Sequence, residues 1–537
     1  MIMEGYNYQL NLKNLFSNTK RLFGSKEIVY RNIRRYTYSE FLDRVNGLCA
    51  GLQEIGVKKG DVIGVLDWDT TTYMESYFAI PMSGAVMHTV NIRYPPELIY
   101  LTMNHAGDRY VIVRDEFVPI LEKSAPLFDF IKGWITYSDI TKKVQTSLSP
   151  HYDYDELVKR TSCEPPDIDE NSQATVFYTS GTTGMPKGVT FTQRNLFLHT
   201  LSLVAFMKYP PLSLTATDVF MSLVPMFHVH SWGMPYVALL NGNKYVLPGK
   251  YEPAVLLNLL KNEKITFSTM VPSILYMILS APNIDEFRDY LRGWKVIIGG
   301  AALPRGLAEK ARNFGITTIG GYGLSETCPV LTIAVKNDQA LRLSDEEVMD
   351  YLTSAGLPVP MANVKVVDSS GKEVPWDSST VGEVVARAPW LTQGYYLDPD
   401  KSEELWRGGW LHTGDLAVID KLGYIHVVDR EKDAVKSGGE FIPTLIVENV
   451  LSEVSGVGEV AVIGVPDERW GERPVAFITK RGEVGEREIY NHLDNYVKIG
   501  RIQKWWIPDK IVFVESMPRT STNKVDKKEL RKAYTSG

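Results

Sequence analysis

A loop rich in glycine and hydroxyl side chains is the segment of this 537-residue chain best suited to chemistry. It reads YTSGTTGMPKG, from Tyr178 to Gly188, and follows the strand-like run ATVF. Glycines let backbone N–H groups turn toward an anion, while the hydroxyl groups and Lys187 add donors and positive charge. No G-x-x-x-x-G-K-[ST] pattern runs through it, so kinase-type P-loop chemistry is disfavoured. Taken alone, a cluster of this composition is more often a plain exposed turn.

The elements that must position this loop alternate in type through the first two-thirds of the chain. A helix is expected over Tyr38–Ile55, where apolar residues recur at helical spacing. Short β-branched runs predict strands at Val62–Leu66, Tyr110–Val113, Ala174–Tyr178, Val219–Val224, Ile265–Met270 and Lys295–Ile298. Such alternation indicates an α/β fold of layered subdomains built on largely parallel sheets.

The pattern changes after about Val364, where close-spaced strands with Gly and Pro turns predict an antiparallel or β-barrel-like subdomain. The charged run DREKD then precedes SGGE, and we expect a domain boundary there. The predicted division is a large domain over residues 1–430 and a small α+β domain over residues 431–537. The small domain's expected elements are strands at Val460–Val465 and Val475–Ile478, helices at Leu445–Leu451 and Arg487–Tyr496, and a short basic helix after Asp526.

Composition is that of a soluble globular protein, with 44% hydrophobic and 23% charged residues. A net charge of −6 gives no electrostatic case for nucleic-acid binding. We see neither a signal peptide nor an apolar run long enough to span a membrane. Cys49, Cys163 and Cys328 are widely separated, which favours a reducing cytoplasm over a disulfide framework. Peripheral membrane association stays compatible with these features.

The loop from Tyr178 to Gly188 resembles the signature loop of the adenylate-forming superfamily. That superfamily contains acyl-CoA synthetases, peptide-synthetase adenylation domains and firefly-type luciferases. Further segments resemble it in the same order, from about Tyr38 to Leu530: GVKKGDVIGV, GAVMHTVN, PMFHVHSWGMP, GGAALP, GYGLSET, TGD, DREKDAVKSGGEFI and PRTSTNK. The resemblance implies ATP, Mg²⁺ and coenzyme A as reaction partners, and the likeness to fatty-acyl members is compatible with a homodimer.

The resemblance also implies a nucleotide site. Tyr322 would stack on the base, Ser325 would donate to the α-phosphate, and Glu326 would offer a hard oxygen ligand to Mg²⁺. Asp415 suits two ribose hydroxyl donors, with Arg430 on the other side of the nucleotide. The full set of expected ATP- or AMP-binding residues is Thr179, Ser180, Gly181, Thr182, Thr183, Gly184, Lys187, Gly300, Ala301, Ala302, Gly321, Tyr322, Gly323, Ser325, Asp415 and Arg430.

Two further residues are expected beside the reacting atoms. His228 would position or stabilise charge, since a carboxylate nucleophile needs no base near neutral pH. Lys524, in PRTSTNK, would bridge carboxylate and α-phosphate, two groups whose negative charges approach one another. Asn523 stands where the motif usually has glycine; asparagine tolerates positive φ, so the turn is expected to survive.

The same resemblance implies a moving small domain. Lys432 would be the hinge between two half-reactions, and Lys436, Gly438 and Gly439 would lie in the loop that faces the coenzyme A channel. Trp232 matches a tryptophan that gates the acyl tunnel in some fatty-acyl relatives.

The substrate is the least determined feature. Strings such as FHVHSWGMP and KWWIPDKIVF are most similar to medium- and long-chain fatty acyl-CoA synthetases. Small, branched, hydroxy or aromatic acids stay open, as does an acyl-AMP ligase that hands its product to a carrier protein. Luciferase-type oxygenation and a catalytically dead sensor are the remaining alternatives.

Overall fold

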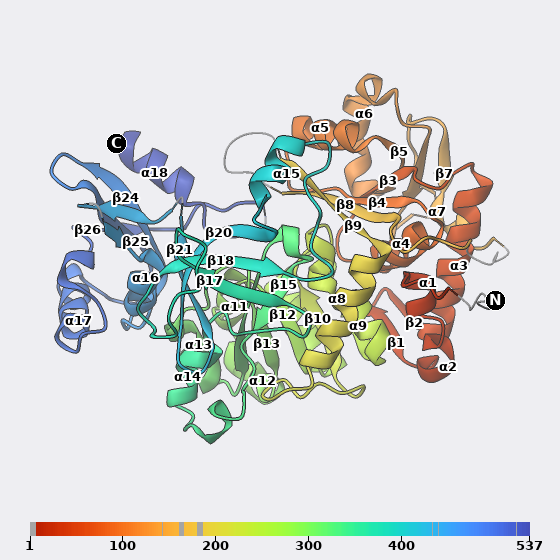
Figure 1. The fold of residues 1–537 in the computed structure, drawn as a ribbon. Helices are drawn as coiled ribbons and strands as arrows, with labels where there is room; N and C mark the ends of the chain where they lie inside the picture. Colours follow the sequence, from red (N-terminus) through yellow and green to blue (C-terminus); the bar gives the residue numbers. More distant parts are fainter. Residues whose placement is uncertain are drawn as a thin grey trace, which may run out of the picture.

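The computed structural model describes residues 7–141, 143–160, 166–179, 186–431, 433–438, 440–521 and 523–536. Figure 1 shows the C-terminal segment, in blue, lying against one side of the rest of the chain. In this described part the strands form four sheets. No helix among these residues is long and apolar enough to cross a membrane.

One largely parallel sheet carries the loop from Tyr178 to Gly188. Its strand order is β7-β6-β5-β3-β4-β8-β9, and only the β8–β9 pairing is antiparallel. The strands are β3 (Val62–Leu66), β4 (Val86–Thr89), β5 (Asp108–Arg114), β6 (Gly133–Tyr137), β7 (His151–Asp153), β8 (Gln173–Thr179) and β9 (Lys187–Thr192). β3 is buried along its whole length, which is typical of a parallel strand covered on both faces.

A second sheet supplies most of the other motif-bearing strand ends. Its order is β16-β15-β14-β13-β12-β10-β11-β1-β2, parallel from β14 through β1. The strands are β1 (Glu27–Tyr30), β2 (Arg34–Thr37), β10 (Val219–Leu223), β11 (Lys244–Leu247), β12 (Phe267–Met270), β13 (Lys295–Ile298), β14 (Thr317–Gly323), β15 (Val330–Ile333) and β16 (Leu357–Pro358).

Helices pack on and between these two sheets. The predicted helix is confirmed as α3 (Tyr38–Glu54), which begins with a capping box between Thr37 and Glu40. The other α-helices here are α1 (Leu12–Leu15), α2 (Thr19–Phe23), α4 (Thr71–Met82), α5 (Pro96–Ala106), α6 (Val118–Lys123), α7 (Tyr154–Leu157), α8 (Gln193–Phe206), α9 (Met234–Asn241), α10 (Pro253–Glu263), α11 (Pro272–Leu279), α12 (Arg288–Leu291), α13 (Arg305–Asn313) and α14 (Glu347–Leu352).

The third sheet is antiparallel, as the change of pattern after Val364 predicts. It contains β17 (Asn363–Val367), β18 (Gly382–Arg387), β19 (Trp406–Arg407), β20 (Trp410–Ile419) and β21 (Ile425–Arg430), with helix α15 (Pro399–Leu405) between β18 and β19. Val366, Val384 and Ile419 form a small core of their own with neighbouring apolar side chains. This half-barrel sheet brings the TGD motif to one edge of the site.

The C-terminal segment has a separate hydrophobic core, which includes Val447, Val462 and Leu493. Its sheet has the order β23-β22-β25-β24, with β26 paired to β25. The elements are β22 (Val435–Ser437), β23 (Glu440–Ile442), α16 (Thr444–Ser452), β24 (Val457–Asp467), β25 (Gly471–Lys480), α17 (Glu486–Lys498), β26 (Lys510–Val514) and α18 (Lys527–Ser536). The mixed α/β class expected from the sequence is confirmed.

Candidate active site

The two ends of the glycine-rich loop are fixed by a strand pair. Thr179, the last residue of β8, pairs with Lys187, the first residue of β9. The Nζ atom of Lys187 lies 4.4 Å from the centre of the Tyr395 ring. Five of the loop residues expected to bind phosphate lie outside the described residues: Ser180, Gly181, Thr182, Thr183 and Gly184.

Tyr395 joins the loop lysine to the acidic residue of GYGLSET. Its hydroxyl group donates to Glu326 Oε1 at 2.7 Å, while its ring faces Lys187. Glu326 lies with Ser325 in a short turn, η5 (Ser325–Thr327), and is half-buried. Sequence reasoning missed Tyr395, because nothing in the string LTQGYYLD distinguishes it from a core tyrosine.

Glu326 has the chemistry that a magnesium ion accompanying ATP requires. No group of three or more acidic, histidine or cysteine side chains able to hold a metal occurs among the described residues. Mg²⁺ bound with a nucleotide takes one or two carboxylates and fills the rest of its shell with phosphate oxygens and water. A single half-buried carboxylate, oriented by Tyr395, therefore fits that ion.

Asp415 is the centre of a second polar group. It is only 3% exposed, and it accepts from the Tyr322 hydroxyl at 2.8 Å and from Arg430 Nε at 2.9 Å. Asp415 and Arg430 face each other across the β20–β21 pair, so the half-barrel sheet fixes both. Burial, followed by the charge of Asp415, raises the pKa of Tyr322 well above its usual value, which keeps the phenol protonated as a donor.

The glycines of GYGLSET are required by close packing. A Cβ atom on Gly323 would lie 1.7 Å from the carbonyl oxygen of Pro329. One on Gly321 would lie 2.9 Å from a side-chain carbon of Ile297. Any side chain at Gly323 would therefore displace the turn that presents Ser325 and Glu326.

GGAALP forms a loop between β13 and α13 that touches two of the expected functional residues. Gly300 has a φ of 74°, and a Cβ atom there would lie 3.1 Å from Cε of Lys524. On Gly299 a Cβ atom would lie 2.9 Å from the Trp232 ring. Ala301 and Ala302 are exposed at the surface of this loop.

Lys524 reaches this group from the C-terminal segment and is half-buried beside Gly300. Burial, with a further contribution from Arg430, lowers the pKa of its ammonium group to about 8. The negative charges of Asp415 and Glu326 partly offset this by raising the pKa of Lys524. Asn523 has a φ of 67°, so the expected left-handed turn before the lysine is confirmed.

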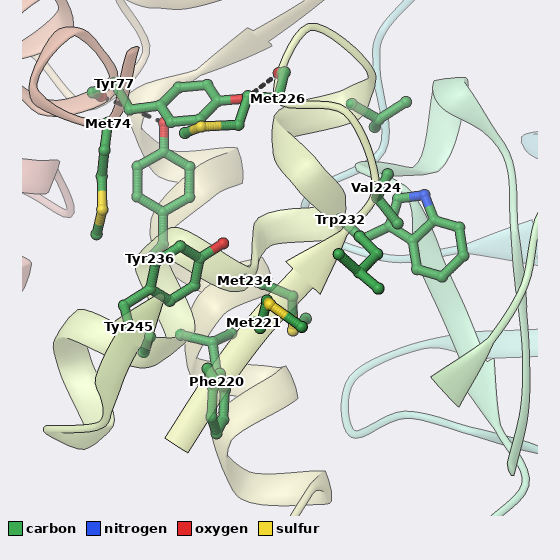
Figure 2. Close-up of a cluster of buried hydrophobic side chains, with 14 of the residues drawn as sticks. Met74, Tyr77, Phe220, Met221, Val224, Met226, Trp232, Met234, Tyr236 and Tyr245 are labelled. Carbon is green, nitrogen blue, oxygen red and sulfur yellow. Dashed lines mark hydrogen bonds between the residues drawn. The ribbon is translucent and has the colours of Figure 1, made fainter. Parts of the chain in front are cut away.

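An unusual backbone segment follows His228 and includes Trp232. From Val229 to Trp232 every residue has a positive φ, between 44° and 56°, and Gly233 continues the run. Burial, with the nearby Lys524 charge second, lowers the pKa of His228 to about 3, so its imidazole is neutral. Trp232 is buried and belongs to the apolar cluster drawn in Figure 2. A left-handed run of non-glycine residues is strained, and such strain concentrates at functional sites.

The loop expected to face coenzyme A contacts the C-terminal sheet. The backbone N–H of Lys436 donates to Glu472 at 2.9 Å, and that of Gly438 donates to the Trp470 carbonyl at 2.8 Å. Lys432 and Gly439 lie outside the described residues. The structure therefore brings Lys524 to the residues expected to bind the nucleotide, whereas Lys436 and Gly438 bond to Glu472 and Trp470 of the C-terminal segment.

Two family models match this chain. The AMP-binding enzyme model covers residues 16–396, and the AMP-binding enzyme C-terminal domain model covers residues 446–524. The chain belongs to the AMP-binding enzyme family. It is an AMP-forming acid–thiol ligase of that family, and ATP and coenzyme A are its co-substrates.

Similar proteins in this family share nearly the whole chain. A long-chain-fatty-acid–CoA ligase of Thermus thermophilus is 36% identical over 98% of this chain and 96% of its own length. A 3-methylmercaptopropionyl-CoA ligase of Ruegeria lacuscaerulensis is 33% identical over 98% of this chain and 97% of its own length. A medium-chain-fatty-acid–CoA ligase of Ectopseudomonas oleovorans is 31% identical over 98% of this chain and 96% of its own length.

The fold is also that of solved adenylate-forming enzymes. The anthranilate CoA ligase AuaEII in complex with anthranoyl-AMP superposes with a TM-score of 0.85 at 22% identity, covering 98% of each chain. A Mycobacterium tuberculosis fatty acyl CoA synthetase superposes with a TM-score of 0.72 at 25% identity, covering 98% of this chain and 99% of its own.

Proposed function

We propose that this AMP-binding enzyme activates a medium- or long-chain fatty acid and joins it to coenzyme A through an acyl-adenylate. The observation that carries the proposal is the position of Lys524, which comes from the C-terminal segment yet lies against Gly300 of the GGAALP loop. A cation there is surrounded by Asp415, Arg430 and Glu326 as its charged neighbours. A cytoplasmic location and a homodimer stay predictions.

In the first half-reaction a carboxylate oxygen attacks the α-phosphorus of ATP, and the bond to pyrophosphate breaks. Lys524 would donate to both the carboxylate and the α-phosphate, which brings a positive charge to the point where two anions approach. His228 is neutral, because its pKa is about 3, so it would orient the reactants by hydrogen bonding and take no proton from the acid.

The remaining polar residues would hold the nucleotide. Asp415, held by Arg430 and the Tyr322 hydroxyl, would bind the ribose hydroxyl groups. The Tyr322 ring would stack on the base, and Ser325 would donate to the α-phosphate. Lys187 and the glycine-rich loop would hold the other phosphates. Glu326 would hold Mg²⁺, which neutralises phosphate charge when bound.

In the second half-reaction the thiolate of coenzyme A attacks the acyl carbonyl, and AMP leaves. We propose that residues 431–537 rotate about Lys432 between the two steps. That movement would withdraw Lys524 and present Lys436, Gly438 and Gly439 toward the coenzyme A channel. The separate apolar core of the C-terminal segment supports movement as a rigid unit.

The fatty-acid assignment is supported by two of the similar proteins, which are named as long-chain and medium-chain ligases. Trp232 would border the acyl chain, since it lies against Gly299 at the nucleotide-side loop and also belongs to the apolar cluster. A second candidate substrate is a short thioether acid, because proteins at 33% and 30% identity are named as 3-methylmercaptopropionyl-CoA ligases.

The test is AMP release by the purified enzyme with a panel of acids, with and without coenzyme A. The panel runs from acetate to stearate and includes 3-methylmercaptopropionate, 4-hydroxybutyrate and cinnamate. Coenzyme A-dependent turnover that peaks at medium or long chains is the expected result. A peak at the thioether acid would support the second candidate.

Adenylate formation that coenzyme A cannot discharge would instead indicate a carrier-protein acceptor. Absence of turnover with every acid would refute both candidate substrates and support a sensor role.

A further inference from the structure

The turn that carries Lys524 requires a residue able to adopt positive φ. The N–H of Asn523 donates to the Thr520 carbonyl at 2.9 Å, and the N–H of Lys524 donates to Thr520 Oγ1 at 3.2 Å. Asn523 itself has a φ of 67°. Glycine suits such a position best, and asparagine is among the few alternatives. The asparagine found here therefore keeps the turn and adds a side chain that glycine lacks.

That added side chain contacts the large part of the molecule. Asn523 Nδ2 donates to Ser273 Oγ at 3.1 Å, and the Ser273 hydroxyl donates to the Asn523 carbonyl at 3.0 Å. One serine hydroxyl thus accepts from and donates to the same residue. Both residues are half-buried, where a neutral hydrogen bond competes less with water than it does at an open surface.

The position of Ser273 places this contact next to the functional end of Lys524. Ser273 is the second residue of α11, two positions after Val271. A Cβ atom on Gly300 would contact both Val271, at 3.2 Å, and Cε of Lys524, at 3.1 Å. The start of α11 therefore borders both the backbone of the turn and the aliphatic part of the lysine.

A second set of contacts to the turn comes from the loop after β4. Asn91 Nδ2 donates to Ser521 Oγ at 3.1 Å, and Arg93 Nη1 donates to the Ser521 carbonyl at 3.1 Å. These contacts fix the turn three residues before Lys524. The Ser273–Asn523 pair fixes it one residue before, so it has more control over where the ammonium group lies.

We propose that Asn523 and Ser273 are positioning residues that hold Lys524 in place for adenylate formation. The proposal rests on the proposed function, because it assigns the pair to one of its two half-reactions. The pair must separate when the small domain rotates, so it is expected to favour the first half-reaction and to contribute nothing to the second.

The experiment compares Asn523→Gly, Ser273→Ala and the double variant in the two half-reactions. Glycine accepts the φ of residue 523, so the first variant removes the side chain without straining the turn. Acid-dependent exchange of pyrophosphate into ATP reports adenylation, and release of AMP from supplied acyl-adenylate and coenzyme A reports thioester formation. Ser280→Ala is the matched control, because Ser280 is the C-cap of the same helix and its hydroxyl donates to the Tyr276 carbonyl, away from the Lys524 turn.

Asn523→Gly removes one neutral hydrogen bond and is expected to slow the maximal exchange rate about 5-fold. Ser273→Ala removes that bond and the bond to the Asn523 carbonyl, so it is expected to slow exchange further. The double variant is expected to be no slower than Ser273→Ala, since that change alone already removes both hydrogen bonds of the pair. The KM for ATP, thioester formation and the melting temperature should match the wild type and the Ser280→Ala control.

Equal losses in both half-reactions, or a double variant with multiplied effects, would overturn the pairing. Wild-type exchange in all variants would overturn it as well, while leaving the proposed function intact. A wild-type enzyme without acid-dependent exchange would instead refute the proposed function on which the pair depends.

Discussion

At the scale of single residues, the environment of Lys524 sets its charge. Burial and the Arg430 guanidinium lower its pKa to about 8, well below the usual value of a lysine. Lys524 therefore titrates near the physiological range, although it must be an ammonium group to bridge two anions. The same lysine placed on an exposed helix would stay charged at any working pH.

The first prediction is that adenylation declines as pH rises through about 8, because the ammonium form of Lys524 is lost there. Below that pH Lys524 is charged, so its ionisation is expected to cause no further change in the adenylation rate. The measurement is the pH profile of pyrophosphate exchange at ATP well below its KM, because that condition reports the ionisation of the enzyme without bound nucleotide. Arg430→Gln should move the decline to higher pH, because it removes a positive neighbour that lowers this pKa. A profile that stays flat up to about pH 10 would contradict the assignment.

The second prediction concerns Tyr395, which orients Glu326 and covers Lys187. Tyr395→Phe removes the donor to the carboxylate but keeps the ring, so the KM for MgATP should rise about 10-fold, as for a hydrogen bond to a charged group. Tyr395→Leu also removes the cation–π contact with Lys187 and should raise the KM for MgATP further. Binding of MgATP measured by calorimetry should follow the same order. Tyr209→Phe, at an exposed tyrosine, is the control.

At the scale of elements, the contact between helices α13 and α16 sets how closely the C-terminal segment approaches the preceding part of the chain. The N–H of Arg305, at the start of α13, donates to Asn449 Oδ1 of α16 at 2.6 Å. A Cβ atom on Gly306 would lie 2.2 Å from the Ser452 carbonyl oxygen. The absence of a side chain at Gly306 is therefore what permits this contact between the two helices.

The third prediction is that Gly306→Ala slows adenylation by about 10-fold or more while thioester formation from supplied acyl-adenylate persists. Alanine favours the helix itself but forces α16, and with it Lys524, away from its present position. The two half-reactions are measured separately, with circular dichroism to check that the helices remain. Asn313→Ala, on the exposed face of α13, should leave both rates unchanged. An unchanged exchange rate in Gly306→Ala would show that this contact is dispensable.

At the scale of the whole molecule, the proposed site draws residues from both parts of the chain. The described contacts of the C-terminal segment place Lys524 among residues of the preceding part, while Lys436 and Gly438 contact their own sheet. The proposed mechanism requires both sets of residues at the same reacting atoms, one set in each half-reaction. This is the structural reason for proposing rotation about Lys432.

The fourth prediction is that Lys432→Pro blocks thioester formation far more than adenylation. Proline fixes φ, so a chain that must change φ at this residue loses one of its two arrangements. Because the structure already brings Lys524 to Gly300, adenylation is the step expected to remain. Separate assays of the half-reactions check this, with Lys432→Ala as the control for loss of the side chain alone. Equal impairment of both steps would remove the main support for a hinge at this position.

The sequence by itself determined the order of the elements and the residue types of the site. Short β-branched runs predicted β3 and β13 to the residue, and the helical spacing of apolar residues predicted α3 to within one residue of its end. A local pattern is sufficient there, because each of these elements is buried through its own apolar residues. The motif order likewise indicated the family, and it predicted roles for Lys524, Asp415 and Glu326.

Only the tertiary structure decided which side chains support those residues. Tyr395 lies 69 positions from Glu326, and Ser273 lies 250 positions from Asn523, so no local pattern connects either pair. The pKa values of Lys524 and His228 likewise depend on burial and on charges from distant segments. Hydrogen bonds and electrostatic interactions act through space, and the distances that govern them exist only once the chain has folded.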